Sequence, residues 1–309
     1  MPELPDVELY REALVRHYGD AVVDRVSLRS PFVVRTAEPE LFAIEGRRLL
    51  GVERLGKRLV WQFDGELFLV LHLMIAGRLH QKKPSTAPQG KNDLAAFHFM
   101  RLDEATGAPA PLPTLMLTEA SQQKRASIHM VAGRAGLAAH DPGGIEPLTM
   151  TLAEFRARLT GEHHTLKRSL ADPRLLAGIG NAYGDEILHA AQLSPVQLST
   201  RLNEDEIARL YEAVQATLAA WTERLRAEIG DDFPEKVTAF RPEMAVHGKF
   251  GQPCPACGTT VQRIRYAANE TNYCPRCQTG GKLLADRSLS RLLKGDWPTT
   301  VDEWEQRQG

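Results

Sequence analysis

The sequence lacks several features that would place it in a specialised class. No segment approaches the roughly 20 uninterrupted apolar residues of a membrane span, and no cationic stretch leads into an apolar one at the N-terminus. We therefore expect neither a membrane nor a secreted protein, but a cytoplasmic one. A net charge of −1 also argues against a uniformly basic coat for nucleic acid.

Cysteine is absent outside one window, which holds two C-x-x-C pairs separated by 16 residues: Cys254 with Cys257, and Cys274 with Cys277. This spacing is typical of zinc sites, because each pair can place two thiolates on one tetrahedral ion. Disulfide pairing is the weaker alternative in a chain with no export signal. Four thiolates leave no open coordination position, so we expect one structural Zn²⁺.

The length of 309 residues predicts two or three domains, and the content of 43% hydrophobic and 25% charged residues is that of a globular protein. Charge is unevenly distributed. Between His247 and Gly295 eight Lys and Arg residues accompany two acidic ones. A second basic run comprises Arg47, Arg48, Arg54, Lys57 and Arg58. The runs predict two basic faces, with solvated helix surfaces as the alternative.

Met1 is followed by Pro2-Glu3-Leu4-Pro5-Asp6-Val7-Glu8. Removal of Met1 leaves Pro2 as a secondary amine with a pKa near the value of about 7.7–8.0 for chain termini, so much of it is uncharged at neutral pH. Such an amine can attack an aldehyde-like carbon and form an iminium cation, and Glu3 is placed to move protons there. The alternative is that this N-terminal sequence has no catalytic role.

Hydrophobic patterns predict an antiparallel, sandwich-like N-terminal domain. A helix is expected over residues 5–18, and Asp64-Gly65 predicts a hairpin turn. The expected strands are 58–63, 67–74, 95–102, 114–117 and 127–131. Residues 84–91 and 105–113 are expected to be loops.

Residues 141–148 are interpreted as a hinge, after which the pattern becomes helical. Helices are expected over 152–159, 165–170, 181–191 and 203–229. Asn203 and Glu206 are expected to cap the last helix. Two glycines precede Asn181, which is expected to cap its own helix. This arrangement predicts either a phosphate-binding site at the helix N-terminus or a glycine-containing connection between helices without a binding role.

Four of these features occur together in one family, and the chain resembles the formamidopyrimidine-DNA glycosylase/endonuclease VIII family of base-excision enzymes. The matches are the start at Pro2, Gly56-Lys57-Arg58, the segment 176–183 (LAGIGNAY) with Asp185-Glu186, and the four-cysteine finger. They span residues 2–277 in the family's order. Leu4 is similar to the formamidopyrimidine branch, because the other branch has glycine there.

The resemblance implies a multidomain α+β fold: a catalytic β-sandwich (1–140), a helix–two-turn–helix domain (141–245), a zinc finger (246–296) and a tail (297–309). It implies that the chain binds damaged double-stranded DNA as a monomer and acts as a glycosylase and abasic-site lyase. Pro2, Glu3 and Lys57 are the implied catalytic residues. The implied DNA contacts are His72, Met74, Arg125, Lys167 and Asn181. Met74 corresponds to the residue that fills the hole left by the flipped base.

The chain departs from the family pattern in three places. The wedge loop reads TEASQQKRAS over 118–127, so that Arg125 replaces the wedge arginine and Ala126 lies near the place of the aromatic residue. Asn269 takes the place of an arginine in the finger, and residues 230–245 lack the Gly-rich loop that covers 8-oxoguanine. We therefore expect the abasic-site cleavage activity to be retained more fully than the excision of 8-oxoguanine. A catalytically weakened damaged-DNA-binding protein is the alternative function.

Overall fold

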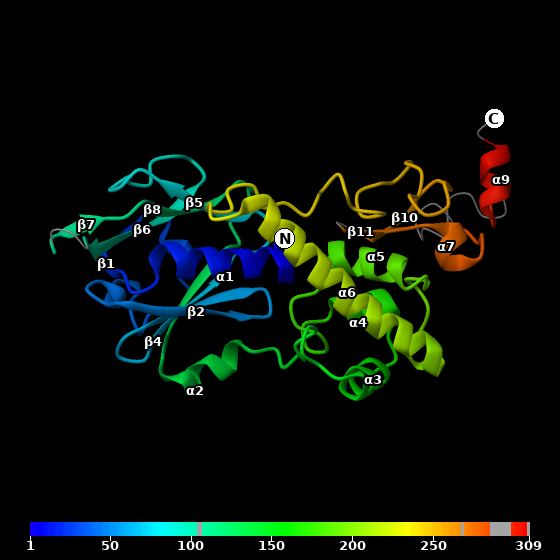
Figure 1. Cartoon of the computed structure of the whole chain (residues 1–309), viewed down its shortest axis with the longest axis horizontal. Helices are drawn as coiled ribbons and strands as arrows, with labels where there is room; N and C mark the ends of the chain where they lie inside the picture. The colour runs from blue at the N-terminus through cyan, green and yellow to red at the C-terminus, as the bar shows by residue number, and fades with distance from the viewer. Residues whose placement is uncertain (104–106, 267–268, 285–297, 308–309) are drawn as a thin grey trace. The chain divides into compact units, whose positions relative to one another are not determined.

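The computed structural model describes residues 1–103, 107–266, 269–284 and 298–307 (Figure 1). Its contacts divide the chain into two compact units. Unit 1 comprises Met1–Pro142 and Trp221–Thr238, and unit 2 comprises Gly143–Ala220 and Ala239–Gly309. The cut after Pro142 falls inside the segment interpreted as a hinge. The long helix α6 (Glu204–Ile229) contributes residues to both units.

Unit 1 contains two antiparallel sheets, which confirms the predicted sandwich class (Figure 1). In one sheet the strand order is β1-β6-β8-β5, with β7 paired to β6, and in the other it is β2-β3-β4-β9. The first sheet is formed by β1 (Val22–Leu28), β5 (Gly77–Lys82), β6 (Asp93–Leu102), β7 (Pro109–Pro111) and β8 (Thr114–Glu119). The second is formed by β2 (Leu49–Leu55), β3 (Arg58–Phe63), β4 (Leu67–His72) and β9 (Ser127–Ala132).

Tight turns set the register of the second sheet. Asp64-Gly65 joins β3 to β4 as predicted, with Gly65 at φ +73° and Phe63 paired with Leu67. The two-residue turn Gly56-Lys57 joins β2 to β3, and Gly56 has φ +59°. Glycine supplies this positive φ without steric cost, and the turn therefore places Lys57 directly before β3.

One hydrophobic core joins the two sheets of unit 1. The fully buried Trp61 ring of β3 lies 4.9 Å from the Phe97 ring of β6, centroid to centroid. Helix α1 (Leu4–Tyr18) packs against β2 and β3 and buries Tyr10 and Leu14 in the same core. The predicted helix begins one residue later than the observed one.

Unit 2 contains the predicted helices as α3 (Leu152–Thr160), α4 (Leu166–Ala171), α5 (Asn181–Ala190) and the first part of α6. The Asn203 side chain accepts a hydrogen bond from the Glu206 amide at 2.9 Å, and the Glu206 carboxylate accepts one from the Asn203 amide at 3.0 Å. This reciprocal pair confirms the predicted cap of α6. The apolar stripe of α6 is buried, as expected for core: Ile207, Leu210, Val214, Leu218, Trp221 and Leu225.

The four-cysteine segment forms a hairpin of β10 (Gln262–Tyr266) and β11 (Asn269–Tyr273), followed by α7 (Pro275–Thr279). The described part of the tail carries α9 (Val301–Gln306), which contacts the end of the finger. The Val301 amide donates to the Gly281 carbonyl at 2.9 Å, and Val301 is 1% exposed. The tail is therefore anchored to the finger. The predicted boundary at 296 and 297 lies outside the described residues.

Several elements were not expected from the sequence. Strands β1, β2 and β5 and the short helix α2 (Gly133–Leu137) lie in stretches without a clear periodicity. Strand β7 occupies part of the predicted loop 105–113. Among the described helices, none has the length and apolarity to cross a membrane.

Candidate functional site

The N-terminal residues lie at the start of α1, and they are buried there. The Asp6 carboxylate accepts a hydrogen bond from the Glu3 amide at 3.0 Å, and the Glu3 carboxylate accepts one from the Asp6 amide. Glu3 is 3% exposed, and Pro2 is buried beside it. The helix cap therefore fixes Glu3 close to the chain terminus.

Charged side chains surround the terminal amine. Burial lowers the pKa of the Met1 amine below its ordinary value, with smaller opposing effects from the charges of Glu3 and Asp6 and supporting ones from Arg78 and Lys57. A lowered pKa leaves more of this amine uncharged at neutral pH. The structure thus brings Glu3 and Lys57, two of the predicted catalytic residues, to one amine.

His72 lies beside the turn that carries Lys57. It ends β4, where it pairs with Arg58 of β3 and Ser127 of β9. The pKa of His72 is lowered to about 4, chiefly by burial and also by the neighbouring charges of Arg58, Lys57 and His129. His72 is therefore neutral near pH 7, and it can bind a phosphate as a hydrogen-bond partner without adding charge.

Met74 occupies the turn between β4 and β5. It has φ +54°, an uncommon conformation for a residue with a side chain, and it lies outside the buried core. Its neighbour Ile75 is 59% exposed. The Arg78 guanidinium donates to the carbonyls of Ile75 at 3.1 Å and Gly77 at 2.6 Å. An apolar tip at the surface, held by backbone contacts, fits a side chain that enters DNA better than one that fills a core.

Glu119 organises the loop that carries Arg125. Its carboxylate, 1% exposed, accepts hydrogen bonds from the amides of Arg125 at 2.8 Å and Ala126 at 3.0 Å. The Arg125 side chain is exposed, while Ala126 is 2% exposed. The position near which the family has an aromatic residue therefore holds a small buried side chain.

The strand directions explain why these residues gather. Strand β3 begins, β4 ends and β9 begins at the same end of one antiparallel sheet, since Arg58 pairs with His72 and His72 with Ser127. The predicted residues Lys57, His72 and Met74 stand at this end. Sequence spacing alone does not reveal that the loop preceding β9 joins them there.

In unit 2, the start of α5 differs from the expectation. Gly180, not Asn181, is the cap residue, and Asn181 is the first residue of the helix. The Asn181 amide group is used elsewhere: it donates to the carbonyl of Glu270 in β11 at 2.8 Å. The predicted capping role was therefore wrong, because this contact with the finger hairpin draws the side chain away from the helix end.

Lys167 belongs to a buried network around Asp185, which is 0% exposed. The Lys167 ammonium lies 2.5 Å from Asp185 Oδ1 and donates to the Asn181 carbonyl. The other carboxylate oxygen contacts His247 Nδ1 at 2.8 Å and accepts the Asn272 amide at 3.1 Å. The sequence matches named Lys167 and Asp185 but not this arrangement, which ties α4 and α5 to the finger.

Glu186 makes a second connection from α5. Its carboxylate, 6% exposed, accepts hydrogen bonds from three consecutive amides, those of Ala245 at 2.7 Å, Val246 at 2.9 Å and His247 at 2.9 Å. A buried carboxylate that lost these donors would carry the full cost of desolvation. Asp185 and Glu186 therefore fix how the chain enters the finger.

The four cysteine sulfurs fit a zinc ion. All four Sγ atoms lie within 4.8 Å of one another, and the Cys254–Cys277 and Cys257–Cys274 pairs are 3.9 and 3.4 Å apart. Zn–S bonds of about 2.3 Å in a tetrahedron require sulfurs about 3.8 Å apart. His189 Nε2 lies 3.3 Å from Cys254 Sγ and can donate to that thiolate, a contact that the sequence did not indicate.

The arginines of the finger differ in their contacts with other side chains and in their exposure. Arg263 lies 3.4 Å from Glu270 and stacks over the Phe250 ring at 4.0 Å. Arg276 contacts Asp302 of α9 at 3.2 Å. Arg265 is exposed, as is Asn269. Three other residues of the basic run, Arg287, Arg291 and Lys294, lie outside the described residues.

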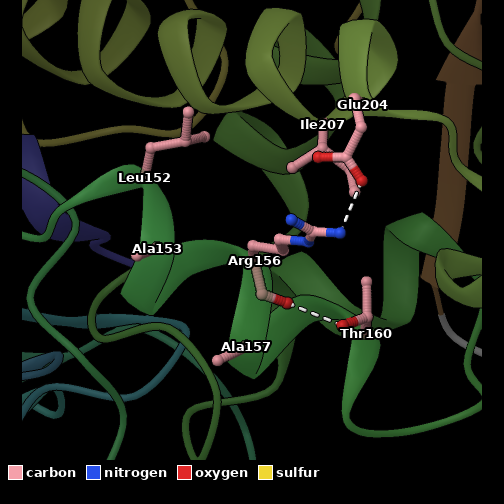
Figure 2. Close-up of a pocket in the computed structure, with 7 residues that line it drawn as sticks. All are labelled: Leu152, Ala153, Arg156, Ala157, Thr160, Glu204 and Ile207. Carbon is pink, nitrogen blue, oxygen red and sulfur yellow. Dashed lines mark hydrogen bonds and ion pairs between the residues drawn. The ribbon is translucent and has the colours of Figure 1, made fainter.

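A cavity of about 560 Å³ lies between α3 and the start of α6 in unit 2. Figure 2 shows the residues that line it. The ion pair of Arg156 and Glu204, 2.5 Å apart, closes one side of it. The lining residues are Leu152, Ala153, Arg156, Ala157, Thr160, Glu204 and Ile207. None of them belongs to the clusters described above, so this cavity is not the candidate site.

The antiparallel sandwich, the helix–turn–helix elements and the four-thiol site define a multidomain zinc-finger protein of mixed α and β structure. Three family models match it in order: the formamidopyrimidine-DNA glycosylase N-terminal domain at residues 1–107, the H2TH domain of the same enzyme at 144–229, and the zinc finger found in FPG and IleRS at 251–280. The chain belongs to the formamidopyrimidine-DNA glycosylase family.

Individual relatives agree with this assignment. A formamidopyrimidine-DNA glycosylase of Heliobacterium modesticaldum is 31% identical over 288 residues, which cover 90% of this chain and 100% of that protein. The crystal structure of the MutM (Fpg) protein of Thermus thermophilus has 31% identity and a TM-score of 0.72, covering 90% and 98% of the two chains. A Lactococcus lactis Fpg in complex with DNA that contains N7-benzyl-Fapy-dG has 25% identity and a TM-score of 0.78, covering 90% and 100%.

Proposed function

We propose that this protein is a bifunctional DNA glycosylase and abasic-site lyase of base excision repair. The observation that carries the proposal is the buried N-terminus, where an amine of lowered pKa lies within the electrostatic reach of Glu3 and Lys57. Removal of Met1 would make the secondary amine of Pro2, which is buried beside Glu3, the new terminus. Membership of the family supports the same chemistry, and the zinc finger supplies one structural Zn²⁺.

The proposed reaction begins when the Pro2 nitrogen donates its electron pair to C1′ of the damaged nucleotide. The glycosidic bond breaks, and the base leaves with that bond's electrons and takes up a proton. The nitrogen loses its proton, and its electron pair then expels O4′ from C1′, so that the sugar ring opens, O4′ takes up a proton and an iminium cation forms. The cation acidifies the C2′ proton, whose removal expels the 3′ phosphate (β-elimination), and a second elimination expels the 5′ phosphate. Glu3 is the proposed proton carrier at the sugar.

The proposed partner is damaged double-stranded DNA, bound by a monomer. Lys57, His72 and Asn181 are the proposed phosphate contacts, Met74 enters the helix, and Arg125 faces the opposite base. Lys167 acts through Asn181, because its ammonium bonds the Asn181 carbonyl and Asp185. We keep the expected domains, which end at residues 140, 245 and 296. We also propose that the protein acts in the cytoplasm, associated with the nucleoid.

Two observations favour the alternative, a damaged-DNA-binding protein with weakened catalysis. Ala126 is buried near the place of the wedge aromatic residue, and Asn269 takes the place of the finger arginine. Both changes affect recognition and leave the residues at the amine intact. The enzymatic proposal is therefore preferred.

Borohydride trapping on a duplex with one abasic site separates the two functions. The processed protein should form a covalent adduct and cut the strand, because borohydride reduces the Schiff base to a stable amine. Binding without an adduct and without scission would establish the alternative. Neither binding nor trapping would reject both.

We expect Glu3→Gln to lower base excision by about 10²- to 10⁴-fold, the usual contribution of a positioned acid or base. Glutamine has a similar shape and retains an oxygen that can accept the Asp6 amide. The matched control is Asp6→Asn, which alters the other half of the same cap and should cost no more than about 1 kcal/mol of stability. Single-turnover excision and thermal unfolding measure the two effects. Equal excision by both variants would contradict the assigned role.

We expect Lys57→Met to reduce the slope of log affinity against log salt by about 0.9, the contribution of one neutralised phosphate. His72→Asn should weaken binding at pH 7 without changing this slope, because the lowered pKa of about 4 leaves His72 uncharged. Fluorescence anisotropy with an abasic duplex at several salt concentrations measures both slopes. A loss of slope in His72→Asn would show that DNA binding charges this histidine.

A further inference from the structure

Residues 230–238, here called the strap, follow α6 and belong to unit 1. At one end, Arg16 and His17 of α1 contact the carbonyls of Gly230 at 2.9 Å and Asp231 at 3.0 Å. In the middle, Phe233 is 6% exposed and packs against Tyr10, with ring centroids 5.9 Å apart. The strap is thus fastened to the helix that begins at the reactive terminus.

The other end of the strap is fastened to β5. The Glu235 carboxylate contacts His80 Nδ1 at 2.6 Å and accepts the Gln81 amide at 2.8 Å. Val237 is 5% exposed in the core of unit 1, and its carbonyl accepts a hydrogen bond from Arg78 Nε at 2.6 Å. The region expected to lack a Gly-rich covering loop is therefore, up to residue 238, anchored to the sandwich.

Arg78 connects the strap to the turn that carries Met74. Its guanidinium donates to three carbonyls, those of Ile75 and Gly77 in the turn and that of Val237 in the strap. Five N–H groups in a rigid planar fork allow arginine to hold several acceptors at fixed angles. Because Met74 has φ +54°, the turn is in a conformation that neighbouring structure must maintain.

We propose that Arg78 is a positioning residue that holds the Met74 turn ready to enter DNA, with the strap as its fixed support. This inference rests on the proposed function and deepens it. A turn that is already in place can enter the duplex without first rearranging.

The charge of Arg78 has a second consequence. It is among the charges that lower the pKa of the terminal amine, after burial as the main cause. The charge of Arg78 therefore acts at the chain terminus as well as at the turn. A purely structural arginine would not affect the pH dependence of the reaction.

The test compares Arg78→Met, Arg78→Lys and Arg16→Met. Arg16 is a matched control, because it also donates to a strap carbonyl but lies at the end away from Met74. Borohydride trapping is measured on an abasic site in a duplex and in single-stranded DNA, which has no opposite stack to hold open. A 2-aminopurine beside the abasic site reports unstacking without any covalent step.

Arg78→Met should lower duplex trapping by about 10- to 100-fold, as small misplacements of a reacting group do, while single-stranded trapping changes far less. Its trapping should also require higher pH. Arg78→Lys retains the charge and the pH profile but loses the fork, so the duplex defect and the weak 2-aminopurine signal should persist. Arg16→Met should match the parent protein.

Equal effects on the two DNA forms, or Arg78 variants that behave like Arg16→Met, would overturn the inference. Arg78→Lys keeps the test decisive if Arg78→Met unfolds. Absence of trapping by the parent protein would refute the proposed function instead. In that case the 2-aminopurine signal would still decide whether Arg78 positions the turn.

Discussion

A protein extended by even a few residues before Met1 should lose borohydride trapping by on the order of 10³-fold or more, the scale on which removal of a catalytic nucleophile acts. The extension turns the Pro2 nitrogen into an amide, which has no electron pair available for attack on C1′. Every side chain of the site remains, so the loss reports the amine alone. Retention of Met1 should have the same effect, which mass spectrometry of each preparation can verify.

Pro2→Gly provides the complementary comparison. The terminus is then a primary amine, whose imine must take up a proton to become an electron sink, whereas proline forms an iminium cation directly. Trapping should again be lost. Affinity for an uncleavable abasic analogue should persist in both proteins, since the phosphate contacts are unchanged. Full trapping by the extended chain would remove the foundation of the proposed function.

Cys257→Ser should release zinc, unfold the finger and abolish tight binding to abasic DNA. Structural zinc contributes on the order of 10–16 kcal/mol to the folding of small zinc domains, far more than the remaining core of this segment can supply. One cluster of that core comprises Val246, Val261, Cys254 and Cys274, and Ile264 and Tyr273 are also buried in this segment. Zinc content by a chelating dye, amide hydrogen exchange and anisotropy measure the three effects.

His189→Gln is the graded control for this prediction. It removes the side chain that lies 3.3 Å from Cys254 Sγ while leaving all four thiolates. Loss of such an outer contact typically weakens metal binding by about 10- to 100-fold, so zinc should remain bound but exchange faster. Stoichiometric zinc and undiminished DNA affinity in Cys257→Ser would show that the finger does not depend on the metal.

The residues that cleave the strand and the residues that recognise a particular lesion lie at different positions of the chain. The amine, Glu3 and Lys57 form one cluster, whereas the wedge and finger positions carry Ala126 and Asn269. A panel of duplexes with one lesion each, assayed for scission, would identify the bases that the protein accepts.

Local patterns predicted some of the regular elements, whereas strands β1, β2, β5 and β7 and helix α2 were missed. The strand 58–63, the turn at Asp64-Gly65 and the capped helix α6 follow from short-range chemistry, since alternation, glycine and a capping pair act over a few residues. Strand β5 was not recognised, because Gly77–Lys82 is mostly polar and becomes a strand only through pairing with β8. Its place at the edge of the sheet allows that composition.

The site residues also divide into those that short sequence motifs reveal and those that depend on contacts between distant residues. The zinc ligands and the reactive terminus are contiguous motifs, so their chemistry can be read directly from residue type and spacing. The role of Asn181 could not, because its contact with Glu270 joins residues 89 positions apart. Arg78 was not singled out either, since its partner Val237 lies 159 positions away.

The sequence by itself therefore determined the chemical groups: an imino terminus beside a carboxylate, four thiolates at metal-binding spacing, and the order of the domains that carry them. Only the tertiary structure decided the surroundings of these groups. Burial lowered the pKa of the Met1 amine and kept His72 neutral. Pairing of β3, β4 and β9 brought the DNA-contact candidates of unit 1 together, and Arg78 joined the strap to the turn at Met74. Reactivity follows from residue type, whereas desolvation and position depend on contacts between distant parts of the chain.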